Sequence, residues 1–99
     1  MKTQPIANSF GIMDAPLSEI PGICVAFIRR FDDYHQLAFE QGKHDFSNEL
    51  EHSMNELYSF ADKVNQGQPL SPSDRNDIRM TIKFTEKMAA GELIFTDND

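Results

Sequence analysis

The chain has 99 residues, enough for one domain with a modest hydrophobic core and too few for two. Its formal net charge is -7, from 16 acidic and 9 basic side chains. This balance argues against a general nucleic-acid-binding or anionic-membrane-binding protein, where a basic surface is expected.

Cysteine content and the N-terminal residues indicate a cytoplasmic protein. Cys24 is the single cysteine, so no internal disulfide can form. The N-terminus lacks the apolar segment of a Sec signal peptide. The longest apolar run, Ile23 to Ile28, is far shorter than the about 20 residues that span a bilayer. We therefore expect a cytoplasmic location and no membrane span, although a signal-independent export route would leave no mark in the sequence.

Residues 1–22 are expected to form an irregular leader. Five residues in it typically interrupt helices and strands: Pro5, Gly11, Pro16, Pro21 and Gly22.

The first predicted helix covers residues 23–41. Phe27, Phe31, Tyr34 and Ala38 recur at helical spacing and share one face. Gly42 stands where a C-terminal cap is expected. The apolar run at residues 23–28 also fits a short buried strand, and periodicity does not decide between the two.

The second predicted helix covers residues 46–66, with Asp45 as its N-cap and Gly67 after its end. The short link from the first helix predicts an antiparallel hairpin. The apolar stripe of this second helix consists of Phe46, Leu50, Met54, Leu57, Ala61 and Val64.

The third predicted helix covers residues 72–90, and Gly91 is expected to stop it. Ser71 suits the N-cap and Pro72 the first helical position. An extended, acidic tail over residues 92–99 follows. The sequence thus predicts a mainly α domain over residues 23–91, built as a three-helix antiparallel bundle.

Catalytic and metal-binding residues are not expected, and neither is a cofactor. Asp32 with His35, and Glu49 with His52, have the acid-x-x-His spacing of bundle metal sites. His52 falls on the polar face of its helix, however, so the two pairs would not converge. Cys24 lies about three helical turns from His35, too far for a nucleophile and its base.

Charges are segregated along the predicted helices. Four basic residues follow one another at intervals of four on the third helix and form a basic ridge: Arg75, Arg79, Lys83 and Lys87. Acidic residues dominate the hairpin, and we single out an acidic face: Glu49, Glu51, Glu56 and Asp62. Such a distribution suits a surface that orients a charged neighbour; it also fits a solvated ridge that pairs loosely with the acidic hairpin.

The third helix has a second apolar stripe, made of Met80, Phe84 and Met88, beside the stripe that the core needs. Leu93 and Phe95 in the tail add to it. Methionine adapts to irregular contacts and is common at binding surfaces. We therefore expect these residues, with the basic ridge, to bind the leader, another protein or a second copy of the chain.

About half of the chain shares motifs with one known family. The motifs are Phe46-Ser47-Asn48-Glu49-Leu50 followed by Met54 and Leu57, the Asn65-Gln66-Gly67 break, and Ser71-Pro72-Ser73-Asp74 opening an amphipathic last helix. They resemble the small rod subunits of type III secretion systems and flagellar basal bodies. The resemblance implies an irregular leader and a helical hairpin that polymerises. The strand-like tail after Gly91 departs from the family, whose last helix continues to the end.

These patterns favour a non-catalytic protein-protein interaction protein: an adaptor, a chaperone-like factor or an assembly subunit. One alternative is an inhibitor or immunity-type protein whose acidic face blocks a basic, nucleic-acid-binding site on its target. Another is the rod-like structural subunit. No direct binding of nucleic acid is expected.

Overall fold

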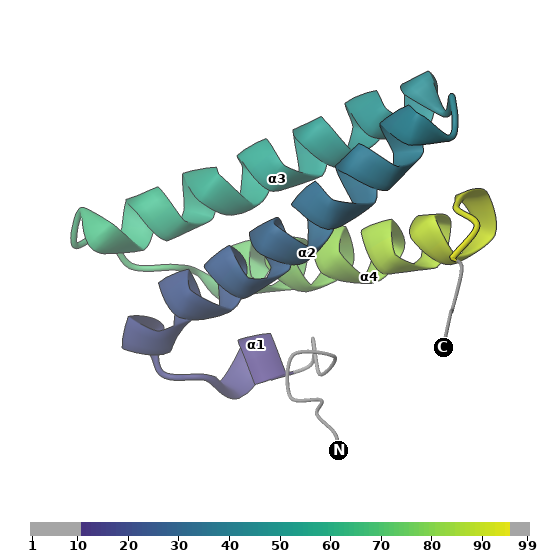
Figure 1. Cartoon of the computed structure of the whole chain (residues 1–99). Coiled ribbons are helices and arrows are strands. Elements are labelled where there is room, and N and C mark those ends of the chain that lie inside the picture. The colour runs from purple at the N-terminus through teal and green to yellow at the C-terminus, as the bar shows by residue number, and fades with distance from the viewer. Residues whose placement is uncertain (1–10, 96–99) are drawn as a thin grey trace, which may run out of the picture.

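The computed structural model describes residues 11–95, and this part of the chain is mainly helical, without a strand. The three long helices are α2 (Ile20–Glu40), α3 (His44–Asn65) and α4 (Pro72–Glu92). Each runs antiparallel to the one before it (Figure 1). None of the helices within residues 11–95 combines the length and the apolar character needed to cross a bilayer.

The described half of the leader is more ordered than expected. Before α2 the chain forms a short helix, α1 (Gly11–Asp14), and a 3-10 turn, η2 (Leu17–Glu19). α2 begins at Ile20, not at residue 23, and Pro21 lies in its first turn. A proline there loses nothing, because its missing N–H would have no partner inside the helix. The strand alternative for residues 23–28 is wrong, and residues 1–10 lie outside the described part.

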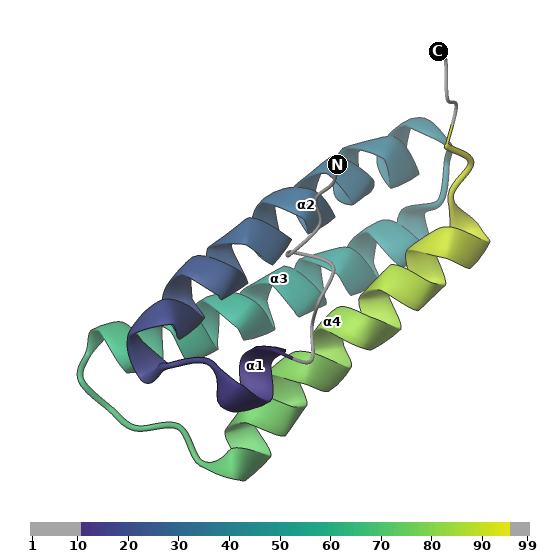
Figure 2. The same ribbon diagram turned by 90° about the horizontal axis from the view of Figure 1, so that it is seen from below.

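α1 docks onto the three-helix bundle. In Figure 2 it lies in the angle between the N-terminal halves of α2 and α4. Ile12 is fully buried there. The Arg75 guanidinium, reaching from α4, donates hydrogen bonds to the carbonyl oxygens of Ile12 (2.8 Å) and Ala15 (2.7 Å). The first turn of the described chain is therefore part of the core.

α2 and α3 end in the same way, with the glycines that the sequence predicted. Gly42 (φ 73°) and Gly67 (φ 83°) adopt left-handed conformations. After α2, Lys43 N–H reaches Ala38 O (2.8 Å) and Gly42 N–H reaches Phe39 O (3.1 Å). This pair of bonds is the Schellman motif, which satisfies carbonyls at a helix end.

Helix starts were predicted less well for α3 than for α4. α3 begins at His44, and no side chain caps it, so Asp45 lies inside its first turn. Ser71 does cap α4: its hydroxyl accepts from the Asp74 N–H (3.0 Å), and the Asp74 carboxylate accepts from the Ser71 N–H (3.1 Å). Bonding to the Ser71 backbone, helped by Lys63, lowers the pKa of Asp74.

Gly91 does not end α4. The helix continues to Glu92, and Leu93 is the first extended residue. Gly91 keeps a negative φ, unlike the two glycines that close α2 and α3. The helix therefore runs about half a turn further than predicted, and only residues 93–95 of the tail are described as non-helical.

The core lies along the axis between the three long helices. α2 contributes most of its aromatic bulk, with the rings of Phe27 and Phe31 6.0 Å apart. α4 contributes one narrow stripe, in which Thr85 and Ala89 take places that larger side chains would fill. Fifteen apolar side chains are buried in the described part: Ile12, Ile20, Cys24, Phe27, Ile28, Phe31, Ala38, Phe46, Leu50, Leu57, Ala61, Ile78, Ile82, Ala89 and Leu93.

Candidate functional site: a groove between α3 and α4

The sequence-predicted apolar stripe and half of the acidic face meet in one groove between α3 and α4, of about 740 Å³. α4 supplies the apolar edge and α3 the polar one. Its lining residues are Glu49, His52, Ser53, Asn55, Glu56, Ser59, Asp77, Met80, Thr81, Phe84, Thr85 and Met88.

Two hydrogen bonds between side chains fix the register of the groove walls. The hydroxyls of Ser53 and Thr85 lie 2.8 Å apart, and Thr85 is almost fully buried. One turn earlier on α4, Thr81 donates to Glu56 Oε1 at 2.8 Å. Since the helices are antiparallel, Glu49 falls level with the last turns of α4.

The apolar edge is open to solvent. Phe84 is 56% exposed and Met88 37% exposed, while Met80 is half-buried. A phenylalanine stabilises a fold mainly by burying its ring, and the largely exposed ring of Phe84 contributes little to the stability of the chain. Exposed apolar side chains that gather in a hollow are typical of binding surfaces.

The charged side chains that line the groove have one sign. Glu49 and Glu56 approach it from α3, and Asp77 approaches from α4. No Lys or Arg is among its lining residues. Carboxylates beside an apolar surface favour a ligand with both apolar and basic groups.

The predicted acidic face is divided between two sides of α3. Glu49 and Glu56 line the groove, but Glu51 turns toward α2, where its carboxylate lies 3.9 Å from His35 Nε2. Asp62 accepts a hydrogen bond from Gln66 at 2.9 Å and lies on the same side of the helix as Glu51. Glu51 and Asp62 therefore lie on a different side of α3 from Glu49 and Glu56.

The four residues of the predicted basic ridge wind around α4, and their contacts differ. The Arg75 guanidinium is bonded to the carbonyls of Ile12 and Ala15, so within the chain it ties α4 to the segment around α1. Arg79 bonds to Asn76 Oδ1 at 2.7 Å. Lys83 and Lys87 are exposed, and Lys87 lies about 60° around the helix from Phe84, on the flank away from α3.

The tail residues do not join the groove. Leu93 is buried in the core, which removes it from the predicted contact surface. The chain beyond it folds toward α2: the Gln41 amide donates to Ile94 O (2.7 Å) and accepts from Ile94 N–H (3.0 Å). The ring of Phe95, although 51% exposed, packs edge-on against Tyr34 at 5.7 Å.

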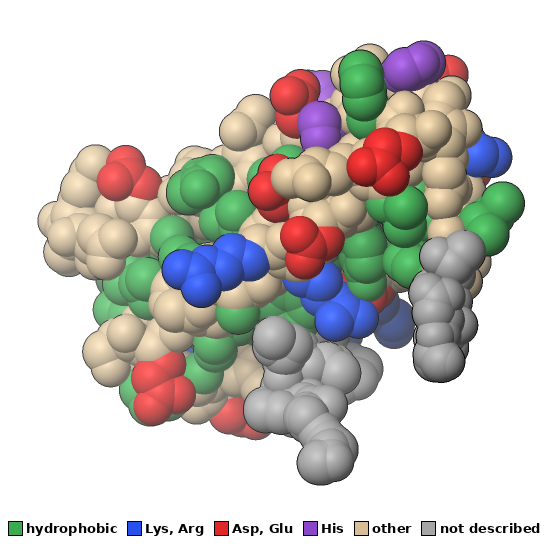
Figure 3. Space-filling model, viewed as in Figure 1, with side chains coloured by type: hydrophobic (Ala, Val, Ile, Leu, Met, Phe, Trp, Pro, Cys, Tyr) green, Lys and Arg blue, Asp and Glu red, His purple; other side chains and the backbone are tan. Residues whose placement is uncertain are grey.

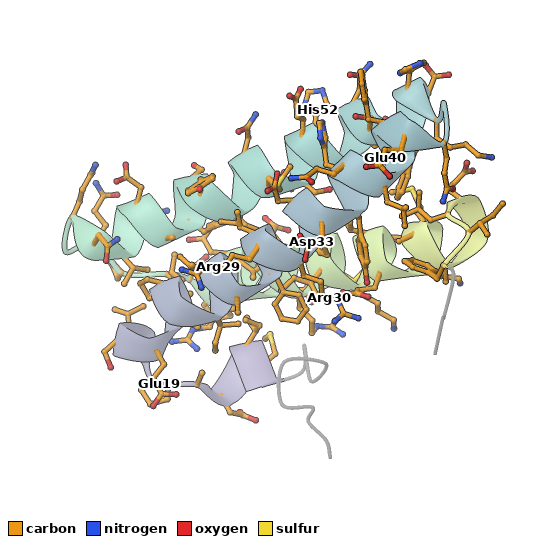
Figure 4. The ribbon with its side chains drawn as sticks, viewed as in Figure 1. Glu19, Arg29, Arg30, Asp33, Glu40 and His52 are labelled. Carbon is orange, nitrogen blue, oxygen red and sulfur yellow. The ribbon has the colours of Figure 1, made fainter. Side chains whose placement is uncertain are left out.

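A polar cluster joins α2 to α4 on the side opposite the groove. Arg30 reaches down from α2 (Figure 4) and pairs with Glu86, which also accepts from the Tyr34 hydroxyl at 2.9 Å. Burial, and then the bond to Glu86, raise the pKa of Tyr34 to about 12. On the surface in Figure 3, charges of both signs are interspersed. We assign this cluster a structural role.

Two side chains of the kinds that most often carry chemistry have opposite surroundings: Cys24 is fully buried, and His52 is exposed. Burial raises the pKa of the Cys24 thiol to about 11, so it stays protonated at neutral pH. Among residues 11–95, no group of three or more His, Cys, Asp or Glu side chains is placed to hold a metal ion. His52 is exposed, as its place on the polar face of α3 predicted, and it lines the groove (Figure 4).

Comparisons of the chain with known protein families, with curated proteins and with solved structures found no match.

Proposed function

We propose that the protein is a non-catalytic protein-protein interaction protein and that the α3–α4 groove is its contact surface. One observation carries the proposal: exposed apolar side chains, with Phe84 at their centre, lie in a hollow whose charged lining residues are all acidic. Apolar anchors surrounded by a polar rim are the usual anatomy of protein interfaces.

The groove suits a helix better than an extended segment. Its α3 wall runs from Glu49 to Ser59, which corresponds to about 15 Å or three helical turns. Two helices that flank a hollow present ridges between which a third helix packs. The matching helix carries apolar side chains at intervals of three or four and Lys or Arg beside them, facing Glu49, Glu56 and Asp77.

A helical peptide library selected against the immobilised protein tests the proposal. We expect the selected peptides to share an apolar stripe flanked by Lys or Arg, and to bind in the groove. Phe84→Ser should abolish their binding. Phe39→Ser is the matched control, because Phe39 is also on a helix and is 63% exposed. Peptides that lose affinity with Phe39→Ser and keep it with Phe84→Ser would place the contact surface at the C-terminal end of α2 and not in the groove.

A further inference from the structure

The exposed apolar side chain of Phe84 on α4 lies between acidic residues of the groove and a basic residue of α4. Going around the helix from the α3 side, the order is the carboxylates of the groove, then Phe84, then Lys87. The apolar anchor therefore has an acidic flank on one side and a basic flank on the other. A second copy of the chain presents the same three elements.

We propose that the groove binds a second copy of this chain, forming a two-fold symmetric dimer in which the two α4 helices run in the same general direction and cross near Phe84. The inference rests on the proposed function, since it names the partner of the same groove. In the dimer Phe84 of one protomer meets Phe84 of its partner across the axis. Self-complementary contacts of this kind are the rule for two-fold dimers.

The charges select the parallel arrangement. When the two-fold axis runs along α4, each residue meets the opposite flank of the partner at the same height. The Ser53–Thr85 and Thr81–Glu56 bonds fix the register of the two helices and place Glu49 within about half a helical turn of the height of Lys87. Each Lys87 then faces the Glu49 carboxylate of the other protomer.

An antiparallel arrangement of the α4 helices does not satisfy the charges. With the axis perpendicular to α4, the acidic flank of one protomer meets the acidic flank of the other. Three carboxylates from each chain, Glu49, Glu56 and Asp77, would then face one another. Like charges placed opposite each other oppose association, and a net charge of -7 on each chain already does so.

Helix packing is compatible with the parallel arrangement. Met80, Phe84 and Met88 are four residues apart and form one ridge of α4. Ridges of this spacing interlock with a copy of themselves when the two helices cross at about 50°. The two-fold axis then bisects the angle between the two α4 helices, and they are in contact near Phe84. Methionine side chains on either side of the central ring adapt to the small mismatches of such a contact.

Sedimentation equilibrium on the full chain, with reversed charges, tests the inference. Lys87→Glu alone places two carboxylates opposite each other at both symmetric contacts, and Glu49→Lys alone places two ammonium groups there. We expect either change to raise the dimer dissociation constant about tenfold. A mixture of the two variants gives a heterodimer in which one contact pairs two introduced charges of opposite sign and the other pairs the two original ones. The double variant Lys87→Glu with Glu49→Lys restores opposite charges at both symmetric contacts, so it should dimerise with close to wild-type affinity.

Three results would overturn the second-copy inference. One is a wild-type monomer at every concentration, another a wild-type dimer that both single variants leave unchanged, and the third a double variant that is as weak as the single ones. The proposed function fails separately. If helical peptides bind equally to the wild type and to Phe84→Ser, the groove is not the contact surface, whatever the oligomeric state.

Discussion

The guanidinium of Arg75 on α4 is bonded to the main chain of α1, 2.8 Å from the carbonyl oxygen of Ile12. A second bond from the same nitrogen reaches Ala15 O. A side chain on the last long helix thereby closes a turn 60 residues earlier in the chain. α1 lacks the length to be stable by itself, so its order depends on this contact and on the burial of Ile12.

Arg75→Met should release α1 while keeping most of the apolar stem. Hydrogen bonds from a charged donor are each worth about 1.5–3 kcal/mol, and we expect the free energy of unfolding to fall by about 2 kcal/mol. Urea denaturation measures this loss, and amide exchange at residues 12–15 should accelerate. Arg29→Met is the control: Arg29 is exposed on α2, and its loss should change stability by less than about 0.5 kcal/mol. Equal effects of the two changes would contradict the role of Arg75.

Gly67 and Gly91 should respond in opposite directions to the same substitution. A Cβ at either position meets nothing within 4 Å, so only the backbone matters. Gly67 has φ 83°, where a side chain costs about 1 kcal/mol; Gly67→Ala should therefore destabilise the protein. Gly91 lies inside α4, and Gly91→Ala should stabilise it by about 0.5–1 kcal/mol. Thermal unfolding of both variants checks the signs; a less stable Gly91→Ala variant would indicate that α4 ends earlier.

The buried thiol of Cys24 predicts a loss of stability at alkaline pH. Its pKa is raised from 9.0 to about 11 in the folded state. The stabilising effect of the protonated thiol is thus complete below pH 9 and disappears as the pH rises through 11. Two pKa units correspond to about 2–3 kcal/mol.

Unfolding free energies of the wild type and of Cys24→Ala, compared at several alkaline pH values, isolate this effect. The variant is less stable at neutral pH because a cavity forms, so the slope with pH is the informative quantity. We expect a shallower fall between pH 9 and 11 in Cys24→Ala. Tyr34, with its pKa raised to about 12, contributes in the same direction at higher pH, and Tyr34→Phe removes that part. Identical slopes for wild type and Cys24→Ala would contradict the burial of the thiol.

Phe84 and Leu93 belonged to one predicted contact surface, yet they should behave oppositely on mutation. Leu93 is buried, and Leu93→Ser should cost about 3 kcal/mol through the lost packing and the new buried hydroxyl. Phe84→Ser should leave the unfolding free energy within about 0.5 kcal/mol of the wild type, because its ring is largely exposed. Urea denaturation of the two variants separates the roles; a large loss with Phe84→Ser would make Phe84 a core residue.

Helical periodicity and cap residues were enough to locate α2, α3 and α4. Phe27, Phe31 and Leu50 are buried as their spacing predicted, and Ser71 forms the predicted cap. The errors lie where one residue type has two uses. Proline often interrupts a helix, but Pro21 occupies the first turn of one; glycine often ends a helix, but the backbone of Gly91 stays helical.

The groove could be predicted only in part. The stripe of Met80, Phe84 and Met88 was visible in the sequence, and so were Glu49 and Glu56. That the stripe and these two carboxylates face each other depends on the register of α3 against α4, which small hydroxyl contacts such as Ser53–Thr85 determine. The same is true of Arg75, whose partners are main-chain atoms of a distant turn. Such contacts leave no periodic signal along the chain.

Methyl NMR of methionine gives the most direct test of the groove as the contact surface. Met80 and Met88 line it, whereas Met54 lies on the α2 side of α3 and Met13 in α1. As the protein concentration is raised, or a selected peptide is added, the methyl signals of Met80 and Met88 should shift while those of Met54 and Met13 stay in place. Shifts confined to Met54 or Met13, or no shift at Met80 and Met88 while the molar mass rises, would contradict binding in the α3–α4 groove.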